Sequence, residues 1–298
     1  LDARGKIISV PTPYIGEDGM AVDGTESMYG VFNISEGQVT LKNMTIYGGY
    51  SSYLAGGITI NRSVVSMENV TVSRCYSGVQ INNGSSVVMK HCNIVRNVRE
   101  YGGGVLLGDY SKLMMDGCSL SENRSLSGSG GGGAMEIQYG CYLYANNTVI
   151  ANNSSTELGG AINLCSGTAL LQNCTVSGNY NITEYPGGGI ANNSGVLYAV
   201  NTIFMDNYHW TGDPAEEPIR SDIGIYWGND NYLYNCIYGG IEGSSSDYTT
   251  TNCINETEKI FAAYRTDGVF YRTNDNTPDY KHSVLTPASV NGKNLYAP

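Results

Sequence analysis

Acidic side chains gather in one irregular stretch of the chain, between residues 206 and 222. Carboxylate oxygens are ligands that Ca²⁺ prefers, and the acids of this stretch are Asp206, Asp213, Glu216, Glu217 and Asp222. The stretch has neither EF-hand spacing nor an aspartate-rich nonapeptide repeat. Prolines and a glycine among the acids are typical of a protruding loop, which such charges keep soluble. We therefore interpret residues 208–222 as a long solvated loop, with a calcium site as the alternative, and we assign no metal and no cofactor.

A pair of carboxylates could instead hydrolyse glycosidic bonds. Glu68 and Asp116 occupy equivalent places in a sequence repeat, two copies apart, which in stacked strands is about 10 Å and at the outer limit for such a pair. Lys90 occupies the same place in the copy between them, so a surface charge ladder explains the three residues without catalysis. We assign no catalytic residue. If the chain were a polysaccharide-degrading enzyme, the acids to consider would be Glu136, Asp206, Asp213 and Glu216.

Tyrosine dominates the aromatic residues, with 24 tyrosines against 4 phenylalanines and 2 tryptophans. Tyrosine is favoured where one side of the ring is buried and its rim is wet. In the later copies of the repeat, aromatic residues recur at or near one outward position: Tyr142, Tyr144, Tyr198, Trp210, Trp227, Tyr232 and Tyr234. Sugars stack on such rings through their apolar C–H faces, so these residues form a predicted glycan-binding strip. The alternative is that the tyrosines only cover the sheet and stabilise it by cross-strand packing.

The eight cysteines would suggest four disulfides in a secreted protein. The repeat argues against this for half of them, because one inward position holds Cys92, Cys118, Cys174 and Cys236, and holds Met44, Val70, Thr148 and Thr202 in other copies. We interpret these cysteines as small buried hydrophobic residues. A strained bridge between Cys92 and Cys118, in adjacent copies, stays open. The chain has no C-x-x-C motif and its three histidines are scattered, so we expect no zinc site.

Two sequence marks define the repeat. The first is a glycine-rich doublet followed by an aliphatic residue, which begins copies at Gly30-Val31, Gly57-Ile58, Gly78-Val79, Gly104-Val105, Ala134-Met135, Ala161-Ile162, Gly189-Ile190 and Gly224-Ile225. The second is an aliphatic residue two places before a residue that is usually asparagine: Leu41, Met67, Met89, Met115, Ala145, Leu171, Ala199 and Leu233. Self-similarity of this kind indicates a stacked repeat architecture.

Apolar residues alternate within each copy, which predicts short strands with one buried face. An asparagine such as Asn43 interrupts the alternation, as expected for a tight bend in the left-handed conformation. A second polar column contains Asn97, Asn123, Asn153, Asn179 and Asn207, followed by Ile241. We predict a ladder of stacked amides there. About eight coils of three short strands each then form an all-β parallel β-helix, because like residues align along its axis.

Some of these residues carry a family resemblance. The segments GGAI (159–162) and GGGI (187–190), alternating with VSGN (176–179) and FMDN (204–207), resemble the repeats of polymorphic outer-membrane-protein-like β-helices. Residues 22–49 are similar to the first coils of right-handed parallel β-helix proteins on bacterial surfaces. The resemblance covers roughly residues 20 to 243 and implies an extracellular bacterial protein, secreted or at the cell surface, that acts as an adhesin. The same fold also carries lyases and hydrolases.

Composition narrows the remaining possibilities. A net charge of −11 would repel nucleic acid, and the apolar runs are too short to insert into a membrane. Because the chain begins at Leu1, we read it as a mature fragment or an excised domain. We expect an N-terminal cap over residues 1–30, repeats over 31–243 and a C-terminal cap over 244–298. The expected partner is a glycan or a host or microbial surface protein, with a polysaccharide-degrading enzyme or a structural spacer as alternatives.

Overall fold

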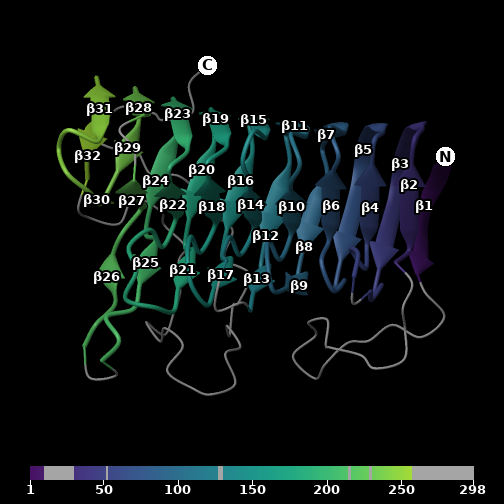
Figure 1. Ribbon diagram of the computed structural model, residues 1–298, viewed down its shortest axis with the longest axis horizontal. Helices are drawn as coiled ribbons and strands as arrows, with labels where there is room; N and C mark the ends of the chain where they lie inside the picture. Colours follow the sequence, from purple (N-terminus) through teal and green to yellow (C-terminus); the bar gives the residue numbers. More distant parts are fainter. Residues whose placement is uncertain (10–29, 52, 127–129, 214–215, 228–229, 257–298) are drawn as a thin grey trace.

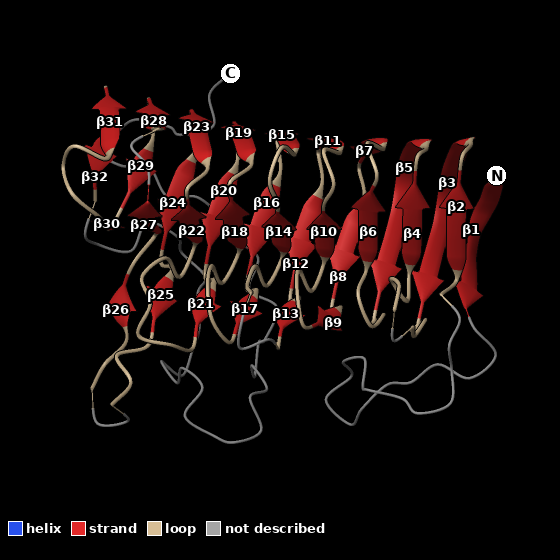
Figure 2. Ribbon diagram, in the orientation of Figure 1, coloured by secondary structure: helices blue, strands red, loops and turns tan. Residues whose placement is uncertain are grey.

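The computed structural model describes residues 1–9, 30–51, 53–126, 130–213, 216–227 and 230–256 of the chain. In these residues every regular element is a β-strand (Figures 1 and 2). The chain coils around one axis and its coils stack side by side, so that equivalent strands line up in three sheets. The all-β parallel β-helix expected from the repeat is therefore confirmed.

Sheet 1 has 17 strands, in two rows that are separated by a bend within each coil. The first row contains β1 (Asp2–Ser9), β3 (Gln38–Tyr47), β5 (Val64–Ser73), β7 (Ser86–Lys90), β11 (Lys112–Asp116), β15 (Tyr142–Asn146), β19 (Thr168–Gln172), β23 (Val196–Val200), β28 (Asn231–Tyr234) and β31 (Tyr248–Thr251). The second row contains β8 (Asn93–Val95), β12 (Ser119–Ser121), β16 (Val149–Ala151), β20 (Thr175–Ser177), β24 (Ile203–Met205), β29 (Ile237–Tyr238) and β32 (Ile254–Asn255). The long strands β1, β3 and β5 run through both rows.

Sheets 2 and 3 form the other sides of the coils, and the strands of sheet 3 begin only at β9, so the first coils lack the third strand that the repeat predicted. Sheet 2 has nine strands: β2 (Phe32–Ser35), β4 (Ile58–Asn61), β6 (Val79–Asn82), β10 (Val105–Leu107), β14 (Met135–Ile137), β18 (Ile162–Cys165), β22 (Ile190–Asn193), β27 (Ile223–Trp227) and β30 (Ile241–Glu242). Sheet 3 has six: β9 (Val98–Arg99), β13 (Arg124–Ser125), β17 (Ser154–Ser155), β21 (Tyr180–Asn181), β25 (Tyr208–His209) and β26 (Ile219–Arg220). Strands β25 and β26 form an antiparallel hairpin, whereas neighbouring coils pair in parallel.

The strand register agrees with the second sequence mark in every copy. Leu41, Met67, Met89, Met115, Ala145, Leu171, Ala199 and Leu233 lie opposite one another in turn along sheet 1. All of them are buried inside the tube. The core is therefore a set of columns of similar side chains, and burial of each column is the main force that holds successive coils together.

The bend between the two rows of sheet 1 also follows the sequence. Its residue has a positive φ in each coil, including 53° at Asn43, 53° at Asn173 and 49° at Asn201. Asparagine tolerates this conformation because its short side chain bonds locally. The amides of neighbouring coils bond to each other here, as in the 3.2 Å bond from Asn201 to Asn173.

The glycine doublets and the asparagine ladder meet at the start of sheet 2. A Cβ on Gly103 would overlap the backbone of Arg124 in the next coil, and a Cβ on Gly104 would lie 3.0 Å from the Cγ of Asn123. Small residues are therefore required at the doublet because sheet 3 and the ladder of the next coil pass close to it.

The predicted amide ladder is present inside the tube. In each step the Nδ2 of one asparagine donates to the Oδ1 of the next, at 2.9–3.0 Å, from Asn97 through Asn123, Asn153 and Asn179 to Asn207. The expectation that Ile241 follows Asn207 in this column is wrong. Asp222 takes that place, because the β25–β26 hairpin returns the chain to the ladder, and Ile241 instead pairs with Ile223 in sheet 2.

All eight cysteines are free thiols. Cys92, Cys118, Cys174 and Cys236 are buried in one inward column, as their interpretation as small core residues requires. The backbone N–H of Cys92 faces the Sγ of Cys118 at 3.5 Å, and Cys118 in turn faces the Oγ1 of Thr148 at 3.4 Å. Cysteine and threonine share this column because both offer a small acceptor to the backbone N–H of the neighbouring coil.

Strands extend into both segments that were expected to be caps. At the N-terminal end, β1 pairs with β3, so residues 2–9 add a strand to sheet 1 and shield that edge. At the other end, β31 and β32 pair with β28 and β29, which carries the stack to Asn255. Residues 10–29 and 257–298 of the two expected caps lie outside the described residues.

Candidate functional site

Five tyrosines lie on the outward side of the first row of sheet 1. Strand register places Tyr144, Leu170, Tyr198 and Tyr232 in one column across successive strands. Tyr142 and Tyr234 project from the same side, two residues away from that column on β15 and β28. We call Tyr142, Tyr144, Tyr198, Tyr232 and Tyr234 the tyrosine face.

The rings of the tyrosine face are held by neighbours but remain open to solvent. Tyr198 and Tyr232 stack with 5.0 Å between ring centroids and 13° between ring planes. The Tyr144 hydroxyl lies 3.0 Å from the Gln172 Oε1. Tyr142 and Tyr198 are 53% and 39% exposed. Because two of the rings cover each other's faces, the surface offers ring edges and hydroxyls rather than a flat stacking platform at that point.

The two tryptophans lie on other sheets. Trp210 directly follows β25 of sheet 3, and Trp227 ends β27 of sheet 2 with 70% of its surface exposed. The linear sequence places both in the same late coils as the tyrosines. Position within a coil decides which sheet a residue joins, so the structure brings five of the seven predicted aromatic residues onto one face.

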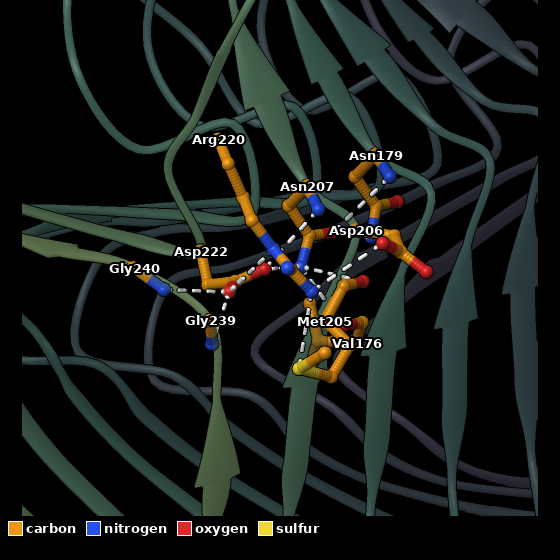
Figure 3. Close-up of polar contacts among 9 residues, drawn as sticks. All are labelled: Val176, Asn179, Met205, Asp206, Asn207, Arg220, Asp222, Gly239 and Gly240. Atoms are coloured by element: carbon orange, nitrogen blue, oxygen red, sulfur yellow. Dashed lines mark hydrogen bonds and ion pairs between the residues drawn. The ribbon is translucent and has the colours of Figure 1, made fainter. Parts of the chain in front are cut away.

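The hairpin at the end of the ladder contains a buried group of charges (Figure 3). The Oδ1 of Asp222 accepts from Asn207 at 2.6 Å, and its Oδ2 accepts from the backbone N–H groups of Gly239 and Gly240 at 2.6 and 3.0 Å. Arg220 reaches Asp206 at 3.3 Å through its Nη2 and Asp222 at 3.8 Å through its Nε. The side chains of Asp206 and Asp222 are fully buried.

Burial raises the pKa of Asp222 to about 7, and the Arg220 guanidinium and the Asn207 amide act in the opposite direction. A carboxylate is nevertheless suited to this position, because both of its oxygens face N–H donors. The cluster joins the hairpin to the preceding and following coils. Since the Asp206 and Asp222 side chains are inaccessible, a polysaccharide could not reach either of them. The cluster therefore stabilises the attachment of the hairpin.

Glu136 lies on the outer side of sheet 2 but is only 5% exposed. Its carboxylate accepts from Gln138 at 2.9 Å and from the Gly131 N–H at 3.4 Å. Burial raises the pKa of Glu136, while its donors and the Arg99 charge lower it. Its partners in the two neighbouring strands are Leu106 and Asn163, so neither of these strands supplies at that position the opposed carboxylate that glycoside hydrolysis needs.

The acids of the predicted loop do not gather in one place. The Glu216 N–H is bonded to the Asp213 carbonyl at 3.1 Å, whereas Asp206 and Asp222 are buried at the base of the hairpin. Among the described residues, no three histidine, cysteine or acidic side chains are arranged to hold a metal ion.

A second ion pair at the hairpin escaped the sequence analysis. The His209 Nε2 lies 3.2 Å from the Glu242 Oε1, joining β25 to β30, and the His209 Nδ1 lies 3.0 Å from the Trp210 carbonyl. Burial is the largest single effect and lowers the pKa of His209, but Glu242 together with backbone groups of Trp210 and Thr183 raises that pKa overall. For Glu242, burial raises the pKa, but His209 and the Ser221 side chain together lower it. No periodic signal links the two residues, because they come from different sheets.

Comparisons with known proteins identify the architecture rather than an activity. No helix among the described residues is both long and apolar enough to cross a bilayer. No curated protein and no solved structure matches the chain. The family model described as "Right handed beta helix region" matches residues 29–207, which covers the coils from β2 to the last asparagine of the ladder. The chain therefore belongs to the right-handed β-helix family.

Proposed function

We propose that this chain is a non-catalytic binding module of a bacterial surface or secreted protein, and that it holds glycans on its tyrosine face in the manner of an adhesin. The observation that carries this proposal is the in-register placement of exposed and half-buried tyrosines on one side of sheet 1. Tyrosine provides a large contact area and a hydroxyl with little loss of conformational entropy. Such residues suit the mixed polar and apolar surface of a sugar.

The regularity of the solenoid supports a functional reason for these tyrosines. The column that holds Tyr144, Tyr198 and Tyr232 holds Thr40, Ser66, Val88 and Met114 in earlier coils, none of them aromatic. The backbone setting is the same in each coil, so strand packing alone does not require an aromatic residue. A change of side chain along one column therefore reflects what the surface contacts.

The enzyme alternative has weaker geometric support. Asp206 is fully buried, Glu136 is nearly so, and neither faces a second accessible acid among the described residues. The spacer alternative predicts no ligand at all, and it is separated from the binding proposal by experiment.

A glycan array followed by titration calorimetry tests the proposal. The triple variant with Tyr144, Tyr198 and Tyr232 changed to alanine is expected to lose at least tenfold in affinity, since aromatic contacts contribute about 1 kcal/mol each at binding surfaces. The matched control is the double variant of Tyr110 and Tyr139, an exposed tyrosine pair in turns outside the tyrosine face, with ring centroids 5.6 Å apart. Equal glycan binding by wild type and the triple variant would contradict the proposal and favour a spacer.

A further inference from the structure

The outward side of sheet 1 has two halves of different charge. From β3 to β11 one column reads Lys42, Glu68, Lys90 and Asp116 along successive strands. Lys42 and Glu68 form an ion pair at 2.5 Å. Opposite charges alternate in this half, so it largely neutralises itself.

The same column becomes uncharged where the tyrosine face begins. After Asp116 it continues as Asn146, Gln172, Val200, Tyr234 and Thr251. The two other outward columns hold Tyr142, Thr168 and Val196, and Tyr144, Leu170, Tyr198, Tyr232 and Thr249, across the same strands. None of these outward residues on β15, β19, β23, β28 and β31 is charged.

The charged residues Lys112, Asp116 and Asp230 border this half, and two of the three are acidic. The Lys112 ammonium lies over the Tyr142 ring, 5.9 Å from its centroid. Asp230, just before β28, accepts from the Tyr232 hydroxyl at 3.1 Å and adds negative charge. The chain as a whole carries a net charge of −11, so an anionic polymer approaching the tyrosine face meets repulsion with little local compensation.

We propose that the tyrosine face selects uncharged glycan chains and excludes polyuronates. This inference rests on the proposed function and adds the charge class of the ligand to it. Hydroxyl groups of a neutral sugar can bond to tyrosine hydroxyls and to the amides of Asn146 and Gln172, while its C–H groups meet Leu170 and the ring edges. A uronate would lose the hydration of its carboxylate, and it would meet no cationic side chain on the outward columns of β15, β19, β23, β28 and β31.

The test compares retention of the protein on a neutral mannan or glucan with retention on polygalacturonate, at low and high salt. We expect retention on the neutral polymer, little change with salt, and no retention on polygalacturonate. Equal or stronger retention on polygalacturonate that depends on the tyrosines would overturn the charge selectivity but leave glycan binding in place. If the protein bound no glycan at all, neutral or acidic, the proposed function would be contradicted, and the charge selectivity with it.

A gain-of-function variant sharpens the comparison. Thr168→Lys places a cation on the tyrosine face without removing a tyrosine, and it is expected to gain about fivefold in binding to polygalacturonate, in a salt-sensitive way. Val64→Lys occupies the same outward column in the charged half, through the register Val64, Ser86, Lys112, Tyr142 and Thr168, and serves as the control. An equal gain in both variants would show that acidic glycans respond only to net charge, which would contradict selection at the tyrosine face.

Discussion

At the scale of single residues, asparagine has two distinct uses in this protein. At the bend within sheet 1 it supplies a left-handed conformation at the surface, as at Asn173. In the inner ladder it supplies hydrogen bonds: the Oδ1 of Asn153 accepts from the N–H and Nδ2 of Asn123, and its own Nδ2 donates to Leu120 and Asn179. The two uses have different energetic consequences because only the ladder is buried.

Asn153→Ala is expected to lower the free energy of unfolding by about 2–5 kcal/mol, since the Asn123 N–H and the Leu120 carbonyl lose buried partners. Urea unfolding followed by circular dichroism measures the change. The control is Asn173→Gly, which keeps the positive φ of 53° at an exposed position and is expected to change stability by less than about 1 kcal/mol. Similar midpoints for wild type and Asn153→Ala would show that the ladder contributes no net stability.

At the scale of elements, the β25–β26 hairpin replaces one step of a regular coil. Its return strand places Asp222 at the end of the ladder, where the carboxylate accepts from Asn207 on one oxygen and from Gly239 and Gly240 on the other. An asparagine could not do the same, because its NH₂ group would face N–H donors in either orientation. The residue type at the end of the ladder thus follows from the donors that surround it.

Asp222→Asn is therefore expected to destabilise the protein by about 2–4 kcal/mol despite its nearly identical shape, because two buried N–H groups lose their acceptor. Thermal or urea unfolding measures this loss. Asp109→Asn makes the same chemical change at an exposed turn and is expected to have little effect. If Asp222→Asn were as stable as wild type, the Asp222 carboxylate would not be what holds the hairpin in place.

The His209–Glu242 pair should make the attachment of the hairpin depend on pH. The raised pKa of His209 means that its stabilisation is complete below the ordinary value of 6.5 and is lost as pH rises through the higher folded value. The lowered pKa of Glu242 means that its stabilisation is complete above the ordinary value of 4.5 and is lost as pH falls through the lower folded value. The pair therefore stabilises fully between about pH 4.5 and 6.5.

The measurement is the free energy of unfolding from pH 4 to pH 9 for wild type and His209→Gln. We expect the difference between them to be largest inside that window and to shrink on both sides. His91→Gln, which changes an exposed histidine outside the hairpin, serves as the control. A constant difference between wild type and His209→Gln would show that the contact does not titrate in this range.

At the scale of the whole molecule, the interior is a single continuous core from Ile34 to Cys236. Burial raises the pKa of Cys75 and Cys236 to about 12 and that of Cys174 to about 11. These thiols react only as thiolates, so both access and ionisation depend on opening of the stack.

Alkylation of the native protein at pH 8 is consequently expected to label Cys75, Cys174 and Cys236 far more slowly than the partly exposed Cys165. Peptide mapping by mass spectrometry gives the rate at each site, and labelling in denaturant gives the total of eight free thiols. Rapid native labelling of Cys174 would contradict a closed core. If two thiols failed to react in denaturant, the protein would contain a disulfide, for example between Cys92 and Cys118.

The sequence alone determined the fold, the strand register and the inner amide ladder. In a solenoid each coil repeats the same local environment, so the residue types recur periodically along the chain. The columns headed by Leu41 and Asn97 could be aligned by counting. Counting residues gave the wrong position for the ladder after Asn207, because the hairpin adds an irregular number of residues there. Asp222, rather than the predicted Ile241, follows Asn207 in the ladder.

Only the tertiary structure decided which predicted residues share a surface. It separated Trp210 and Trp227 from the tyrosines, since a residue's sheet depends on its place around the coil. It also buried Glu136 and Asp206, two acids that the sequence offered as accessible candidates. The ion pairs of Arg220 and His209 join residues that no periodic pattern links. They could therefore be identified only from the three-dimensional structure.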